Sequence, residues 1–132
     1  MGRLKNRAIK YLFTEYIYRA KLRNHSFTIT FKEFVDTIKR PCHYCGSKPS
    51  AKTRSSVKAF TNGIDRVDPT KGYEANNIVA ACVTCNRMKS DFTQDYFIQK
   101  VKKINEFFSN KVKDKGKGLE NYLPRKFNRY HR

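Results

Sequence analysis

Apolar residues recur at helical spacing in the first part of the chain. Between residues 1 and 23 they follow the three-and-four step of an amphipathic helix, and basic side chains occupy the opposite face. The apolar face consists of Ile9, Leu12, Phe13, Tyr16, Ile17 and Ala20. The segment Asn24-His25-Ser26 interrupts this pattern, so the sequence predicts one helix that ends near residue 23.

A second helix is predicted to follow Thr30. The stretch from Thr30 to Glu33 has the form of a capping box, in which the two side chains satisfy backbone N–H groups at the start of a helix. Pro41 ends this helix, because the residue before a proline avoids the helical region. Its apolar stripe consists of Phe31, Phe34, Val35 and Ile38.

The middle of the chain predicts a hairpin followed by a helix. Residues 47–62 are polar and are expected to form a surface loop. Strands are expected at 63–67 and 77–81, joined by a turn that contains Pro69, and a helix is expected to begin within 82–92. After Thr93, a further helical seam repeats at Phe97, Val101, Ile104 and Phe108. Residues 113–132 are rich in charge and glycine, which indicates an extended arm that becomes ordered on binding.

The charge of the chain points to a polyanionic partner. Among 132 residues, 29 are Lys or Arg and 11 are Asp or Glu, which gives a net charge of +18. Such an excess of one sign favours nucleic acid as the partner. An anionic membrane is disfavoured, because the sequence has no long uncharged apolar run. No signal peptide is apparent either, so we expect an intracellular protein in a reducing compartment, not a secreted one.

All four cysteines fall in two Cys-x-x-Cys pairs. Thiols paired in this way in a reducing compartment favour a metal site over disulfides, and four free or redox-active thiols are the alternative. Four thiolates close the tetrahedral coordination of Zn²⁺, so the expected zinc is structural. Its ligands would be Cys42, Cys45, Cys82 and Cys85.

The stretch IDRVDPTKGYEANNIVAACVTCNRMK resembles the zinc-bearing, four-Cys branch of the HNH (His-Me finger) endonucleases. The preceding stretch, YRAKLRNHSFTITFKEFVDTIKRPCHYCG, resembles the lead-in of small phage-type HNH proteins. The resemblance implies an α+β fold: a ββα-metal finger with a structural four-Cys zinc site, flanked by N-terminal helices and a C-terminal helix. Asp65 matches the family's strand aspartate, Asn77 its central asparagine, and Asn86 the residue after the last thiol. The helix lysine of the pattern falls at Lys89.

The resemblance also implies a catalytic divalent ion, Mg²⁺ or Mn²⁺. Asp65 offers a carboxylate and Asn86 an amide oxygen, the ligand type that such hard cations prefer. Asn77 would bond to the loop backbone and hold the hairpin. The alternatives are structural: Asp65 paired with Arg66 or Arg87, and Asn86 as an N-cap.

Arg66 departs from the family pattern, which places a general-base histidine there. A guanidinium stays charged, with a pKa above about 12, and cannot act as a base. A missing general base costs on the order of 10²–10⁴ in rate. Arg66 is suited to gripping a phosphate instead. The nearby candidates for a replacement base are Asp68, Tyr73 and His43. His25 and His131 are remote in sequence, and the approach of one of them in space is left open.

Two functions follow from these patterns. The first is an HNH-type, metal-dependent DNA endonuclease or nickase, impaired by Arg66, whose candidate catalytic residues are Asp65, Arg66, Asn77 and Asn86. The alternative is a non-catalytic zinc protein that binds DNA or structured RNA. DNA is favoured over RNA. Phosphate contacts are expected from Arg66, Arg87, Lys89, Lys113, Lys115, Lys117, Arg125, Lys126 and Arg129.

The expected organisation has four parts. Residues 1–40 form basic N-terminal helices, and residues 41–92 form the zinc-bound ββα core. Residues 93–112 form a C-terminal helix packed on that core. Residues 113–132 form the basic tail.

Overall fold

The computed structural model of the chain describes residues 2–53 and 59–115. The chain divides into two compact units with the boundary between Gln94 and Asp95. The elements of the first unit are α1 (Gly2–Leu22), α2 (Phe31–Ile38), β1 (Ala51–Lys52), β2 (Phe60–Thr61), β3 (Gly63–Arg66), β4 (Ile78–Ala81) and α3 (Val83–Lys89). Helix α4 (Gln94–Lys115) begins at the boundary and continues through the described part of the second unit. No helix in the described ranges is both long and apolar enough to span a membrane.

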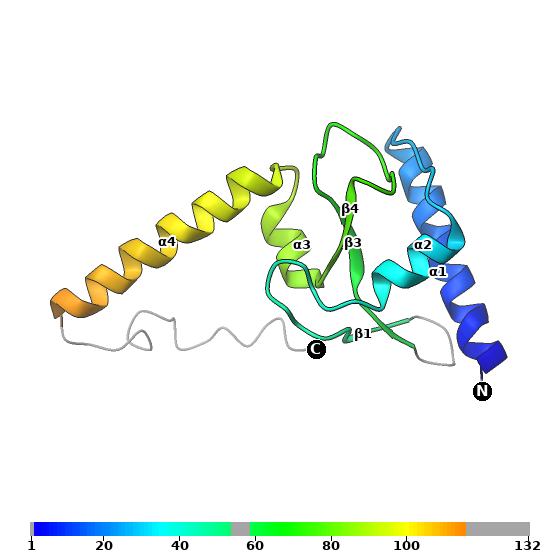
Figure 1. Ribbon diagram of the computed structural model, residues 1–132, viewed down its shortest axis with the longest axis horizontal. Helices are drawn as coiled ribbons and strands as arrows, with labels where there is room; N and C mark the ends of the chain where they lie inside the picture. The colour runs from blue at the N-terminus through cyan, green and yellow to red at the C-terminus, as the bar shows by residue number, and fades with distance from the viewer. Residues whose placement is uncertain (1, 54–58, 116–132) are drawn as a thin grey trace. The chain divides into compact units, whose positions relative to one another are not determined.

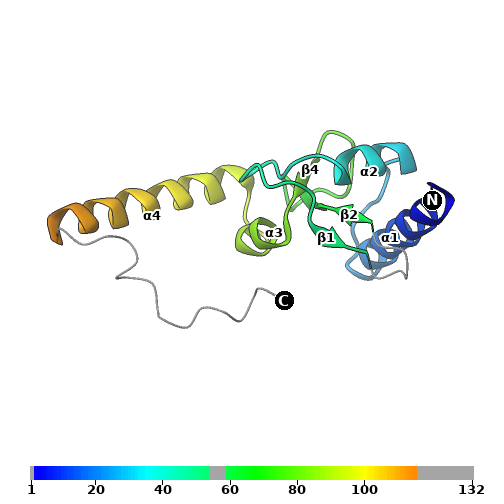
Figure 2. The same cartoon turned by 90° about the horizontal axis from the view of Figure 1, so that it is seen from below.

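The centre of the first unit is a ββα motif. Strands β3 and β4 pair antiparallel, with Gly63 opposite Ala81 and Arg66 opposite Ile78, and α3 follows β4 directly. Helices α1 and α2 lie on one side of this hairpin and α3 lies on the other (Figures 1 and 2). The predicted hairpin and the helix that follows it are therefore present, with strands one residue shorter than expected.

Helix α2 begins where the capping box predicts. The Thr30 side chain accepts a hydrogen bond from the Glu33 N–H, and the Glu33 carboxylate accepts one from the Thr30 N–H at 2.7 Å. The helix ends at Ile38, three residues before Pro41. Phe34 and Ile38 on its inner face are fully buried.

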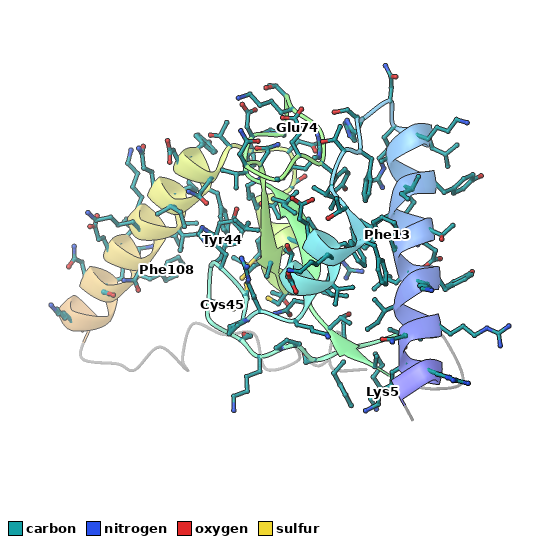
Figure 3. All side chains as sticks on the ribbon, turned by 45° about the vertical axis from the view of Figure 1, so that its right-hand side comes forward. Lys5, Phe13, Tyr44, Cys45, Glu74 and Phe108 are labelled. Carbon is teal, nitrogen blue, oxygen red and sulfur yellow. The ribbon has the colours of Figure 1, made fainter. Side chains whose placement is uncertain are left out.

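The main hydrophobic core forms between α1, α2 and the hairpin. Phe13 of α1 points toward α2 (Figure 3) and makes edge-to-face contacts with Phe27, Phe31 and Phe34 at centroid distances of 5.1–5.5 Å. Such aromatic pairs add about 0.5–1.5 kcal/mol each beyond their buried area. The buried members of the core are Ile9, Ile29, Phe34, Ile38, Ala59 and Ile64.

The expectation of a surface loop over residues 47–62 is wrong for the described part of that segment. Ala51–Lys52 and Phe60–Thr61 form a second antiparallel sheet, and Asn62 is 2% exposed. The Asn62 amide donates to the Arg40 carbonyl at 2.8 Å. A two-residue strand is too short to show an alternation of apolar and polar positions. The polar side chain of Asn62 can be buried because a backbone carbonyl accepts its hydrogen bond.

Helix α4 also extends beyond its expected end at residue 112, to Lys115. Lys113 therefore lies on a helix rather than in an extended arm. The remainder of the predicted tail, residues 116–132, lies outside the described residues.

A close approach of two backbones joins the turn after α1 to the hairpin loop. The Tyr73 N–H donates to the Ser26 carbonyl at 2.8 Å, and the Thr28 N–H donates to the Tyr73 carbonyl at 2.9 Å. Gly72 makes this approach possible, because a Cβ at that position would collide with Oγ and the carbonyl oxygen of Ser26.

We expect Gly72→Ala to destabilise the protein by roughly 1–3 kcal/mol, the usual cost of overpacking, because a backbone atom cannot move aside as a flexible side chain can. Urea unfolding measures the change. Gly2→Ala is the matched control, since a Cβ there meets no atom within 4 Å. Equal stability of the two variants would show that the 26–28 segment tolerates displacement.

Candidate metal and phosphodiester site

The four cysteines come together as their spacing predicts. Cys42 and Cys45 lie in the turn after α2, while Cys82 precedes α3 and Cys85 lies in its first turn. Their sulfurs all lie within 4.8 Å of one another, and Cys45 Sγ is 3.7 Å from Cys82 Sγ. Zinc–sulfur bonds of about 2.3 Å in a tetrahedron separate sulfurs by about 3.8 Å, so this cluster fits a zinc ion.

Backbone hydrogen bonds hold the turn of Cys42 and Cys45 against the hairpin. The His43 N–H donates to the Ala80 carbonyl at 2.8 Å, and the Gly46 N–H closes the turn on the Cys42 carbonyl at 2.8 Å. Gly46 has a φ of 74°, a left-handed conformation that glycine adopts without strain. The turn is therefore held next to β4.

The thiols differ in their readiness to ionise. Hydrogen bonds from Ser47 lower the pKa of Cys45 to about 6, whereas burial raises the pKa of Cys82 and of Cys85. Metal ligation needs thiolates, so a bound cation supplies the positive charge that buried thiolates require.

Asp65 is a buried carboxylate held from two sides. It is 5% exposed; its Oδ2 accepts a hydrogen bond from Tyr44 Oη at 2.6 Å, and its Oδ1 accepts one from Lys89 Nζ at 3.2 Å. Burial and the bond to Asp65 raise the pKa of Tyr44, which stays a neutral donor. Tyr44 comes from the cysteine turn and lies near the hairpin (Figure 3).

Lys89 is fully buried and also donates to the Arg66 carbonyl at 2.9 Å. Its expected contact with a nucleic-acid phosphate is therefore wrong for this structure, because solvent does not reach the ammonium. The ion-pair partner of Asp65 among the described residues is Lys89, and not Arg66 or Arg87 as the structural alternative supposed.

Asn86 directly follows Cys85 in α3 and contacts β3. Its Nδ2 donates to the Ile64 carbonyl at 3.4 Å, which leaves the amide oxygen as an acceptor. An ionised carboxylate offers about four acceptor positions, and Asp65 uses two of them. Both side chains therefore offer oxygen atoms, the ligand type that a Mg²⁺-like ion takes alongside several waters.

The Asn77 side chain makes hydrogen bonds within the hairpin loop. Its Nδ2 donates to the carbonyls of Asp68 and Gly72 at 3.0 and 2.9 Å, and its Oδ1 accepts from the Asp68 N–H at 2.9 Å. It is 4% exposed. The side chain joins three points of the hairpin loop and fixes its shape.

Arg66 holds the other side of the same loop. Its Nη1 donates to the carbonyls of Pro69 and Lys71, both at 2.8 Å, and the guanidinium lies 5.6 Å from the centroid of the Tyr73 ring. Nη1 also makes a longer hydrogen bond of 3.4 Å to His25 Nδ1, while Nε and Nη2 carry the other three N–H donors of the guanidinium. Arg66 also lines a cavity.

That cavity, of about 1090 Å³, brings the site together. Asp65, Arg66, Asn86 and Arg87 all line it, whereas Asn77 and Lys89 are buried and do not line it. Further basic side chains come from the end of α1. The charged side chains around the cavity are Arg19, Arg23, Arg66 and Arg87, with Asp65 and Asp91. Four guanidinium groups against two carboxylates make the cavity attractive to an anion.

His25 also lines the cavity, and sequence reasoning did not place it there. Its Nδ1 lies 3.4 Å from Arg66 Nη1. A lone histidine in a polar turn carries no local signal of such a neighbour. Only the pairing of Ser26–Thr28 with Tyr73 brings it close.

Of the expected phosphate contacts, Arg66 and Arg87 line the cavity. Lys113 is exposed on α4. Lys115 is the last residue of α4 and its side chain is not described. The predicted contacts Lys117, Arg125, Lys126 and Arg129 fall outside the described residues.

Comparison with known proteins identifies the fold. No protein-family model matches the chain. A solved structure titled as the rare-cutting HNH restriction endonuclease PacI aligns with a TM-score of 0.55 and 24% identity, over 83% of this chain and 82% of that one. The chain therefore has the α+β, ββα fold seen in that HNH structure, with a four-cysteine cluster, and the predicted fold class is confirmed.

A curated relative gives less information on activity. The chain is 34% identical over 83 residues to uncharacterized protein R423 of Acanthamoeba polyphaga mimivirus. The match spans 63% of this chain and 14% of the viral protein, so the chain corresponds to a small part of that protein's length.

Proposed function

We propose that this protein is an HNH-type, metal-dependent DNA endonuclease or nickase. The observation that carries the proposal is the position of Asp65 and Asn86 on one arginine-rich cavity, with the Asp65 carboxylate held by two partners that do not line the cavity. The zinc of the four thiolates is structural in this proposal. The structurally similar PacI is named as an HNH restriction endonuclease that perturbs DNA, and this similarity supports DNA as the substrate.

Asp65 and Asn86 would hold a Mg²⁺ or Mn²⁺ ion. When bound, such an ion supplies a positive charge that stabilises the phosphate transition state and the leaving oxygen. Asn86 is adjacent to Cys85, so the zinc cluster orients it. Tyr44 and Lys89 orient Asp65, which is the kind of supporting hydrogen bonding that metal ligands depend on.

The arginines of the cavity bind and align the phosphodiester. Charge-assisted hydrogen bonds from guanidinium groups to phosphate oxygens are short, and two parallel bonds fix orientation. Arg87 is exposed and lines the cavity, while Arg66 offers the part of its guanidinium that the loop does not use. Arg66 thus donates to the loop carbonyls through Nη1, and its remaining N–H groups bind the substrate phosphate.

A second candidate function is binding without cleavage, of DNA or of structured RNA within a larger assembly. The position of Arg66 favours it, because a side chain that holds a loop by two hydrogen bonds needs no catalytic role. A protein of this type would keep the basic cavity and the zinc cluster and would leave phosphodiesters intact.

A plasmid cleavage assay distinguishes the two functions. The zinc-loaded protein with Mg²⁺ or Mn²⁺ should nick or linearise supercoiled DNA, and Asn86→Ala should lose that activity. Asn6→Ala is the matched control, since Asn6 is exposed on α1 and does not line the cavity. Tight, salt-sensitive binding with no cutting by the wild type at any metal concentration would decide for the non-cleaving protein.

A further inference from the structure

We propose that Ser90 is a substrate-binding residue, and that its hydroxyl donates a hydrogen bond to a phosphate oxygen of nucleic acid bound in the cavity. The inference rests on the part of the proposed function that puts nucleic acid in this cavity, and not on cleavage. Two observations carry it. Ser90 lines the cavity, and its backbone has angles that glycine adopts far more readily than serine does.

Ser90 follows α3 in a strained turn. Its φ is 50° and its ψ is −132°. The Phe92 N–H donates to the Lys89 carbonyl at 3.1 Å, which closes a tight turn with Ser90 as its first central residue. These angles are close to those of a type II′ turn, in which glycine is the usual first central residue because it has no Cβ. Glycine would therefore occupy position 90 with less strain than serine.

The Ser90 side chain does not stabilise this turn. The Ser90 N–H donates to the Asn86 carbonyl at 3.0 Å, and a glycine would make the same bond. Within residues 2–53 and 59–115, no group makes a hydrogen bond with the Ser90 hydroxyl. Backbone strain of this kind is concentrated at functional sites, where the side chain is needed for a ligand. The hydroxyl is thus exposed on the cavity wall and available to a ligand.

The cavity also brings Ser90 together with groups that bind phosphate. Arg87 lies on the same helix, is exposed and lines the same cavity, and Arg66 lines it from β3. A serine hydroxyl rotates to suit its partner and can donate to an anionic oxygen. Serine and arginine both contact phosphate oxygens in complexes with DNA, and such contacts fix the position of the backbone without reading the bases. The ligand that fits Ser90 is therefore the sugar–phosphate backbone.

Two negative features near Ser90 act against an anion, and the charge of the cavity outweighs them. The Asp91 carboxylate also lines the cavity, and the end of a helix carries a partial negative charge on its free carbonyls. At the end of α3, however, the carbonyls of Asn86 and Lys89 accept hydrogen bonds from N–H groups of the turn. The four guanidinium groups around the cavity outnumber its two carboxylates.

The test compares DNA binding by Ser90→Ala and Ser90→Gly, both zinc-loaded and without Mg²⁺ or Mn²⁺, so that cleavage does not contribute. Both variants lack the hydroxyl. We expect Kd for a labelled DNA duplex to rise by roughly 10-fold to 100-fold in each, the usual effect of losing a hydrogen bond to a charged group. The dependence of log Kd on log salt should keep its slope, because serine neutralises no phosphate charge. Ser50→Ala is the matched control, since Ser50 is exposed and does not line the cavity.

Urea unfolding gives an independent readout on the same variants. Ser90→Gly should raise the urea midpoint by roughly 0.5 M, because glycine relieves the strain of the turn. Ser90→Ala should keep the midpoint of the wild type, since alanine has the same Cβ. Greater stability together with weaker binding in Ser90→Gly is the result expected of a serine that serves a ligand. A midpoint that does not rise would overturn the argument from strain and, with it, the inference.

The binding outcomes separate the inference from the proposed function. Wild-type affinity in both Ser90 variants would overturn the inference, because the hydroxyl would then contribute nothing. Weaker binding in only one of the two variants would also overturn it, since both lack the hydroxyl and differ only in their backbone freedom and the alanine methyl group. A wild type that binds DNA without cutting it overturns the nuclease function alone, whereas a wild type that does not bind DNA overturns both.

Discussion

Removal of the metal from the four-cysteine cluster is expected to unfold the first unit of this protein. Structural zinc contributes about 10–16 kcal/mol in small zinc domains, as much as the whole stability of a typical domain, about 5–15 kcal/mol. Only a small hydrophobic cluster surrounds the four sulfurs. Its buried residues are Cys42, Ala81 and Cys85. The hydrophobic contacts there are too few to replace the metal.

Two measurements check this expectation. Metal analysis should find one zinc per chain, and Cys85→Ser or prolonged chelation should abolish the cooperative thermal transition seen by circular dichroism. Thr84→Ser is the control, because Thr84 is exposed and lies between Cys82 and Cys85. A chelated protein that keeps the melting temperature of the wild type would refute a structural role for the metal.

The second large effect is expected at the buried pair of Asp65 and Lys89. Asp65→Ala should destabilise the protein by about 3–5 kcal/mol, because it leaves the Lys89 ammonium, which is 0% exposed, without its carboxylate. Replacing both charges, as in Asp65→Leu with Lys89→Met, should recover most of that loss, since a buried ion pair is often no more stable than apolar residues of similar size.

Urea unfolding and plasmid cleavage together separate stability from catalysis. The double variant should regain stability and remain inactive, because it lacks the oxygen ligand of the divalent ion. The exposed pair of Lys32 and Asp36, with Nζ and Oδ2 2.9 Å apart, provides the control: Asp36→Ala should leave the stability close to that of the wild type. A cleaving double variant would show that Asp65 holds no catalytic ion.

The local signals in the sequence located the elements that carry the site. The Thr30 capping box and Pro41 set the limits of α2, and the spacing of the thiols placed the start of α3 at the cluster. These features act within a few residues, so a sequence pattern records them.

Features that depend on tertiary contacts were not predictable in this way. Lysine side chains are almost always exposed, and the burial of Lys89 depends on an aspartate on another element. His25 approaches Arg66 only because Gly72 lets two distant backbones meet. The strands β1 and β2 are too short to show alternation, and their buried polar side chains resemble those of a loop.

The most direct test of the account is the position of a catalytic ion. Crystals of the zinc-loaded protein grown with Mn²⁺ and a DNA duplex can be measured for anomalous scattering. A manganese peak is expected within coordination distance of an Asp65 carboxylate oxygen and the Asn86 amide oxygen, apart from the zinc peak at the four sulfurs. A zinc peak alone, with Asp65 bound only by Tyr44 and Lys89, would contradict it.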